Sequence, residues 1–216
     1  MVPENKRMIA KAVSSVVGLA GALVMMGWIF DINILKSISS AWISMKFNTA
    51  IAFVASGITL YFIVRAFEGE FDQAQVALFI TSLIIILLMG ILFISNLLGV
   101  HTGAEDLFIK EINPSARTVI PGQPSIPTML NFILIALAGI LTILNLKKLR
   151  PKLKIIGLAV GIIGAIAVIG YILNAPILYY YLPSVNSAMA LNTAILFVLL
   201  GIGLLCLSSE EEVRAV

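Results

Sequence analysis

Small polar residues stand at the ends of long apolar segments in this sequence, where their side chains could bind a small molecule. Asn48 and Thr49 lie in the stretch MKFNTAIAFV, and Asn192 and Thr193 lie in the nearly identical stretch MALNTAILFV. Asn and Thr side chains donate and accept hydrogen bonds. We expect the polar corner residues to converge on a small ligand-binding pocket that opens outward; they are Asp31, Asn48, Thr49, Thr128, Asn174, Asn192 and Thr193.

The two asparagines also have a simpler structural interpretation. Asn48 and Asn192 stand where a loop is expected to enter a helix, so each could accept a hydrogen bond from a first-turn N–H as an N-cap. Unpaired donors at a helix end are costly in a membrane, which favours the same cap at both positions. The sequence leaves both interpretations open.

No catalytic or cofactor motif accompanies these residues. The sequence contains no nucleophile elbow, P-loop or dinucleotide fingerprint. The single Cys206 excludes an internal disulfide and a cysteine-based metal cage. His101 is the only histidine, and its pairing with Glu105 and Asp106 in a metal or pH-responsive site is an alternative that the sequence leaves open. We predict a non-enzymatic protein without a cofactor or a metal site.

The composition indicates that these corners belong to a membrane protein. The chain of 216 residues is 60% hydrophobic and only 12% charged, whereas a soluble domain is nearer half apolar and a quarter charged. A hydrocarbon core needs about 20 helical residues per crossing. Six uncharged apolar stretches meet this length, so we predict an all-α integral membrane protein; the stretches are 12–30, 47–64, 76–99, 126–146, 155–173 and 188–208.

The charges of the connecting loops predict an orientation. Of the 14 Lys and Arg residues, all except Lys36, Lys46, Lys110 and Arg117 fall on the side of the two chain ends. Basic loops remain in the cytoplasm, so we expect a multi-pass protein of the plasma membrane with both termini cytoplasmic. The basic residues sit in short loops beside a lipid bilayer, and their distribution does not indicate nucleic-acid binding.

The repeated stretch predicts an internal repeat. Residues 45–60 and 189–204 are identical at 10 of 16 aligned positions, and the preceding segments GWIFDINIL and GYILNAPIL also correspond. A middle copy, SIPTMLNFILI, keeps Thr128 and Phe132 in the places of Thr49 and Phe53. We therefore expect one membrane domain, 1–216, built from three parallel helical hairpins; the repeat units are about 8–66, 76–146 and 155–208.

The longest connection is the outer loop 100–125. Thr102 followed by Glu105 reads as a capping box, which predicts a short interfacial helix from Gly103 to Ile112. Several prolines follow and enforce extended or turned backbone. This loop is either a lid over the expected pocket or a simple cap on the helix bundle.

Small residues at helical spacing predict close helix contacts. Gly157 and Gly161 form a GxxxG step, and Ser14 and Gly18 are spaced in the same way. Such patterns permit close packing inside a bundle or between protomers. We expect contacts inside the bundle, and a homo-oligomer remains an alternative.

Two corner segments carry a family resemblance. The segment GWIFDINILKSI followed by WISMKFNTAIAFVASGITL resembles the N-terminal membrane-embedded sensor region found before PAS, histidine-kinase or diguanylate-cyclase modules in prokaryotic signalling proteins. The segments GVHTGAEDLF and PGQPSIPTMLNF look like the second corner of that region. Pro124 stands here where the family pattern has Met, and Pro127–Thr128 replaces Asn-Thr. The resemblance covers most of the chain and implies no particular ligand.

The resemblance implies a sensor that passes a signal to a cytoplasmic module. The sequence given ends at SSEEEVRAV, so we expect either a longer signalling protein or a protein that stands alone. An accessory subunit of a larger membrane complex and a passive small-molecule carrier are the alternatives. Coupled transporters usually hold an ionisable residue at midplane depth. The predicted spans contain none except Cys206, which counts against active transport and leaves the passive carrier as an alternative.

Overall fold

The computed structural model describes residues 2–39, 41–100, 102–112, 115, 117–144 and 148–208. The described chain is helical, without named strands, and six helices are long and apolar enough to cross a membrane. The prediction of an all-α membrane protein with six spans is confirmed at this level. The spans are α1 (Glu4–Ile29), α3 (Phe47–Phe67), α4 to α5 (Phe71–Leu98), α6 (Ile126–Ile143), α7 (Leu149–Ile172) and α8 (Leu191–Ser208).

The third span contains a change of helical pitch. α4 (Phe71–Ile85) passes through the π-helical turn Ile86–Gly90 into α5 (Ile91–Leu98). Gly99 then ends the span with φ 63°, in the left-handed region that favours glycine.

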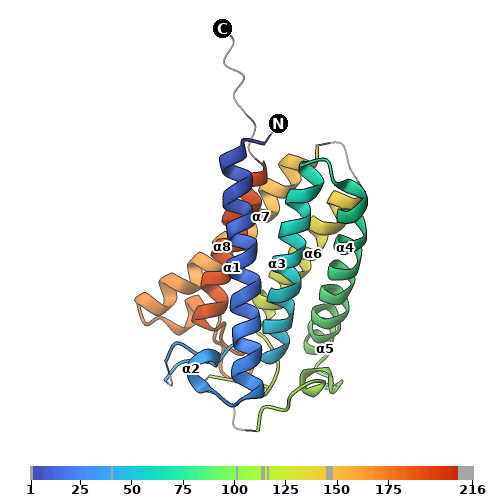
Figure 1. The fold of residues 1–216 in the computed structure, drawn as a ribbon. Coiled ribbons are helices and arrows are strands. Elements are labelled where there is room, and N and C mark those ends of the chain that lie inside the picture. The colour runs from blue at the N-terminus through green and yellow to red at the C-terminus, as the bar shows by residue number, and fades with distance from the viewer. Residues whose placement is uncertain are drawn as a thin grey trace.

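The spans form an inner and an outer set (Figure 1). At least half of the most apolar window of α3, α6 and α8 is buried, against 33% for α1 and α7 and 39% for the span α4 to α5. α1 packs on α3, α4 packs on α3 and α6, and α7 packs on α8. The exposed apolar side chains of the outer set, such as Leu19, Phe79 and Ile162, are the surface that a bilayer would cover.

Small residues bring helices into close contact at two corresponding places. A Cβ atom added at Gly57 in α3 would lie 2.7 Å from the Ser14 carbonyl oxygen in α1. A Cβ atom at Gly201 in α8 would lie 2.8 Å from the Gly157 carbonyl oxygen in α7. The expectation that these small residues pack inside the bundle is confirmed for both helix pairs.

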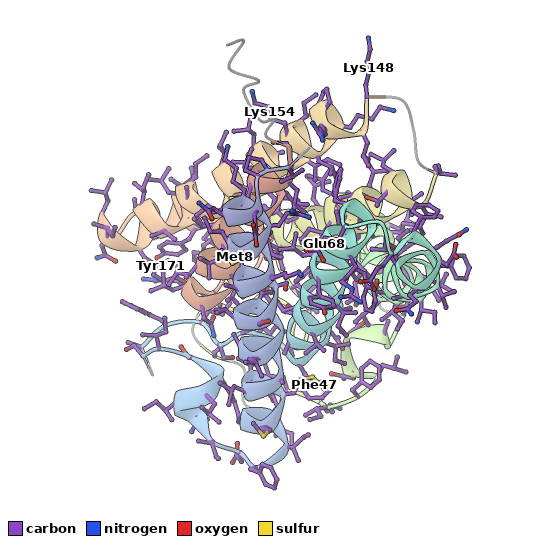
Figure 2. All side chains as sticks on the ribbon, turned by 45° about the horizontal axis from the view of Figure 1, so that its top comes forward. Met8, Phe47, Glu68, Lys148, Lys154 and Tyr171 are labelled. Atoms are coloured by element: carbon purple, nitrogen blue, oxygen red, sulfur yellow. The ribbon has the colours of Figure 1, made fainter. Side chains whose placement is uncertain are left out.

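The two ends of the bundle differ in chemistry. Lys148 and Lys154 lie at the end where α1 begins (Figure 2), and Lys11 pairs there with Glu68 at 2.8 Å. The opposite end carries the short helix α2 (Asn33–Lys36), the loop between α5 and α6, and the 3₁₀ turn Pro176–Tyr179. We call this opposite end the outer end, following the predicted orientation.

The predicted interfacial helix is wrong. In place of a helix from Gly103 to Ile112, the structure has a single 3₁₀ turn, Ala104–Asp106. The physical reason lies in α3, because the Asn48 side chain donates to the Ala104 and Glu105 carbonyl oxygens at 3.3 and 3.1 Å. In an α-helix that began at this point, these carbonyl oxygens would accept the first backbone hydrogen bonds.

Candidate functional site

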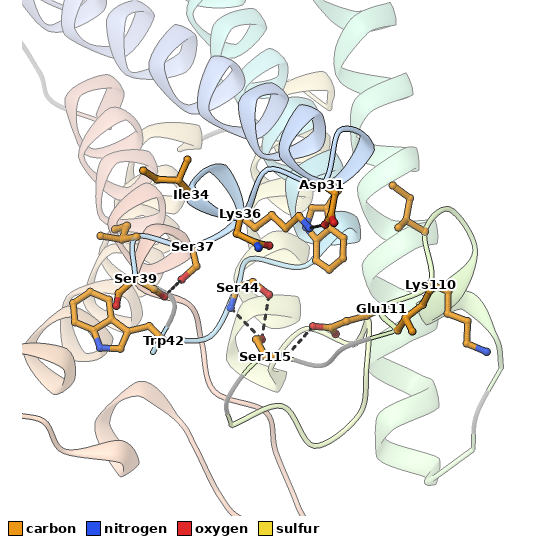
Figure 3. A pocket seen from close by; sticks show the side chains of 15 residues that line it. Asp31, Ile34, Lys36, Ser37, Ser39, Trp42, Ser44, Lys110, Glu111 and Ser115 are labelled. Carbon is orange, nitrogen blue, oxygen red and sulfur yellow. Dashed lines mark hydrogen bonds and ion pairs between the residues drawn. The ribbon is translucent and has the colours of Figure 1, made fainter.

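A cleft of about 760 Å³ opens at the outer end, between the α1–α2 corner and the long loop (Figure 3). Isoleucines supply its apolar lining, and charged and hydroxyl side chains supply the rest. Both tryptophans of the chain, Trp28 and Trp42, line it. The lining is mixed, with more polar and charged residues than apolar ones, and the volume is within the range of small-molecule sites.

One wall of the cleft carries an ion pair against an aromatic ring. Lys36 is buried, and its Nζ lies 2.5 Å from an Asp31 carboxylate oxygen and 4.8 Å from the centre of the Trp28 ring (Figure 3). Trp28 is itself fixed, because its Nε1–H donates to the Met45 carbonyl oxygen at 2.8 Å. Asp31 adopts φ 55°, which aspartate tolerates better than most residues. The wall therefore holds the Lys36 charge in a defined place, whereas the Asp31 side chain is 89% exposed.

The floor of the cleft is a second, fully buried ion pair. Lys46 Nζ lies 2.7 Å from both carboxylate oxygens of Glu111, and the two side chains are 4% and 2% exposed. Lys46 also donates to the Thr118 hydroxyl, and Glu111 accepts from the Gly122 N–H at 2.7 Å. Burial lowers the pKa of Lys46, and the charge and hydrogen bond of Glu111 oppose this effect. The pair ties the long loop to the start of α3.

A second, much smaller cavity lies on the other side of this pair. Its volume available to the centre of a water molecule is about 10 Å³. Glu111 lines the outer cleft, Lys46 lines the small cavity, and Ser44 lines both. Thr49 and Thr128 also line the small cavity, together with Thr193. The Lys46–Glu111 pair therefore separates the cleft from the cavity.

The core next to these threonines is aromatic. Phe53, Phe132 and Phe197 come one helical turn after Thr49, Thr128 and Thr193 in α3, α6 and α8. All three rings are fully buried, and their centres are 4.8, 4.9 and 5.0 Å apart. This cluster closes the bundle beneath the small cavity.

Side chains connect the outer corners to one another. Asn48 bonds to the loop that precedes α6, as described above. Asn192, in the first turn of α8, donates to the Lys36 carbonyl oxygen at 3.2 Å. Asn186 accepts from the Ile126 N–H at the start of α6, at 3.1 Å. Each of α3, α6 and α8 is thus bonded at its outer end to the loop of a different helix pair.

The predicted site residues fall into three groups. Thr49, Thr128 and Thr193 line the small cavity, and Asp31 lines the separate large cleft. Asn174 is exposed, with φ 51°. Asn48 and Asn192 bond to neighbouring loops.

The N-cap interpretation of Asn48 is wrong. α3 begins at Phe47 after Lys46, without a side-chain cap, so Asn48 is the second helical residue. Asn192 is likewise the second residue of α8, and its Oδ1 accepts from the Thr193 N–H at 3.0 Å. The Asn48 side chain therefore bonds to a loop that is distant in the sequence and does not cap α3.

Several residues of the site carry no signal in the sequence. Lys46 and Glu111 are 65 positions apart, and each reads as an ordinary loop charge until the chain folds. Trp28 and Trp42 read as interfacial aromatics. The structure brings both of them to the lining of one cleft.

No group of three or more His, Cys, Asp or Glu residues suited to a metal ion occurs among the described residues. His101, which the sequence offered as a partner of Glu105 and Asp106, lies outside them. Comparisons with protein-family models, curated proteins and solved structures found no match. The resemblance to a signalling sensor region therefore remains a prediction.

Proposed function

We propose that this protein is a non-enzymatic membrane input domain that binds a small amphipathic molecule at its outer end. The observation that carries the proposal is the cleft of about 760 Å³. Trp28 and Trp42 offer it flat apolar surfaces, and the Asp31–Lys36 pair offers both signs of charge. A molecule with an apolar body and a polar group matches this lining.

The cleft is connected to the last span through one backbone group. Lys36 lines the cleft, and its carbonyl oxygen accepts hydrogen bonds from the Met45 N–H at 2.9 Å and from Asn192 at the start of α8. A ligand that moves the Asp31–Lys36 wall would therefore change the position of α8. A signalling role requires such a differential effect on two conformations.

We infer that the domain consists of three parallel hairpins with both termini cytoplasmic. Matching contacts support the repeat. Trp28 donates to the Met45 carbonyl oxygen in the first corner, and Tyr171 donates to the Met189 carbonyl oxygen at 2.9 Å in the last corner. The Gly57 and Gly201 contacts correspond in the same way. The basic residues near the start of α1 and α7 support the orientation.

Tryptophan fluorescence tests the binding role directly, because both tryptophans line the cleft. We expect saturable quenching or a spectral shift on titration with short-chain amphiphiles of zwitterionic, anionic and neutral headgroups. The variant Lys36→Met removes the charge that faces Trp28 and should weaken binding of a charged ligand about tenfold, the value of one lost charged hydrogen bond. The matched control Lys154→Met changes an exposed lysine at the other end and should leave binding unchanged.

A mild-detergent purification of the native protein, with mass spectrometry of all that is retained, separates the alternatives. A covalently continuous kinase or cyclase module would support the input domain. A fixed stoichiometric partner would favour an accessory subunit, and solute flux through proteoliposomes would favour a passive carrier.

A further inference from the structure

Three helices begin around the small cavity on the inner side of the Lys46–Glu111 pair. α3 begins at Phe47, α6 at Ile126 and α8 at Leu191. The third residue of each helix is a threonine, and these three threonines, Thr49, Thr128 and Thr193, line the cavity.

The helix ends give this cavity a positive electrostatic potential. A helix N-terminus carries a partial charge of about half a unit, and three of them meet here. Among the described residues that line the cavity, Lys46 is the only charged one. Glu111 neutralises the Lys46 charge from the far side. The N–H groups of Thr128 and Thr193 already donate to Ser125 and Asn192, so the start of α3 contributes most to the positive potential. This field repels cations and attracts anions.

Hydrogen-bond donors in the cavity lack partners. Thr49 and Thr193 are each 2% exposed, yet their hydroxyl groups form no hydrogen bond with the rest of the described chain. The backbone N–H of Thr49 is also unpaired in this part of the chain. The third threonine differs, because Thr128 shares a hydrogen bond of 2.7 Å with Ser125. Neither hydroxyl is among the fully enclosed side-chain atoms without a partner, so both face the space of the cavity, and an occupant of that space would be their partner.

We propose that the cavity is a binding site for one small anion of the halide class. A space of about 10 Å³ for the centre of a water-sized particle admits a single water molecule or a monoatomic ion. The helix ends favour an anion over a cation, and the hydroxyl groups of Thr49 and Thr193 can donate to it. The bound anion would hold the outer ends of α3, α6 and α8 together.

Bromide is the probe that locates the site. Crystals of the full chain grown in sodium bromide should give one anomalous peak within hydrogen-bond distance of the Thr49 and Thr193 hydroxyl groups. A cavity that holds only water, without anomalous signal, would overturn the proposal. This result would not affect ligand binding in the outer cleft, because Trp28 and Trp42 do not line the cavity.

Thermal unfolding in detergent measures the affinity. At constant ionic strength, bromide should raise the unfolding temperature of the native protein more than the bulky anion gluconate does. The variants Thr49→Val and Thr193→Val keep the side-chain shape and remove one hydroxyl each. Each should lower the affinity for bromide about tenfold, which reduces the rise in unfolding temperature at a given bromide concentration. If either variant does not fold, the bromide peak in the native protein decides.

The control is Thr142→Val in α6. Thr142 is as buried as the cavity threonines, but its hydroxyl donates only to the Ala138 carbonyl oxygen at 2.8 Å. This variant should keep the full difference between bromide and gluconate. An equal bromide response in all variants, or no bromide preference in the native protein, would contradict the proposed site.

Discussion

At the residue scale, the most buried ion pair of the described chain lies beneath the outer cleft. Lys46 and Glu111 are each at most 4% exposed on their side chains, while each of the other ion pairs has at least one considerably more exposed partner. Exposed pairs add little to stability. Removal of one partner from a buried pair leaves an uncompensated charge in a medium of low polarity.

The variant Lys46→Met should therefore destabilise the protein strongly, by about 3–5 kcal/mol. The double variant Lys46→Met with Glu111→Gln should be more stable than this single variant. Its neutral amide still accepts from the Gly122 N–H, as Glu111 does, and no charge remains unpaired. Thermal unfolding in detergent, followed by circular dichroism, measures both effects. Equal losses in the single and double variants would show that the charge of Glu111 is not the cause.

At the element scale, close approach between helices depends on glycines at a few positions. Gly201 meets the Gly161 backbone so closely that an added Cβ atom would lie 2.6 Å from the Gly161 Cα atom. Gly57 meets α1 in the corresponding way. Gly18 differs, because an added Cβ atom there would meet nothing within 4 Å.

The variants Gly57→Ala and Gly201→Ala should each destabilise the bundle, by about 1–3 kcal/mol, the usual cost of overpacking. The control Gly18→Ala adds the same methyl group to a helix with room for it, and alanine favours the helix more than glycine does. Its unfolding temperature should be unchanged or slightly higher. Unfolding temperatures of all three proteins in one detergent provide the comparison, and a loss at Gly18 as large as the others would contradict the packing explanation.

At the scale of the whole molecule, the arrangement of α3, α6 and α8 makes the two ends of the bundle different. Their outer ends share the small cavity, their aromatic residues meet beneath it, and the outer loops lie above it. The other end has short connections and basic residues. This difference between the two ends is what the proposed binding role at the outer end requires.

Cysteine labelling tests the orientation of the molecule. In a Cys206→Ser background, Ile34→Cys should react with a membrane-impermeant maleimide on intact cells, because Ile34 is 78% exposed at the outer end. Asn5→Cys, exposed in the first turn of α1, should react only after permeabilisation. The reverse pattern would show that the termini are extracytoplasmic and that the loop charges do not set the topology.

The loops show where sequence reasoning stopped. The capping box at Thr102 and Glu105 predicts a helix from local spacing alone. The structure forms a 3₁₀ turn there because Asn48, more than 50 positions earlier, bonds to the carbonyl groups of that turn. Asn48 likewise does not cap α3: it lies inside the first turn, and its side chain bonds to this loop. A local sequence pattern cannot predict a hydrogen bond to a residue that is distant in the sequence and becomes a neighbour only in the folded chain.

The sequence by itself determined the six membrane-length helices and the corresponding positions of three threonines in them. Apolar length is a property of each segment alone, and equivalent positions in similar segments place Thr49, Thr128 and Thr193 at equivalent points of three helices. Only the tertiary structure decided the Lys46–Glu111 pair and the cleft above it. Their partners are far apart in the chain, and a buried charge finds its counter-charge only when the packed helices have fixed the loops around it.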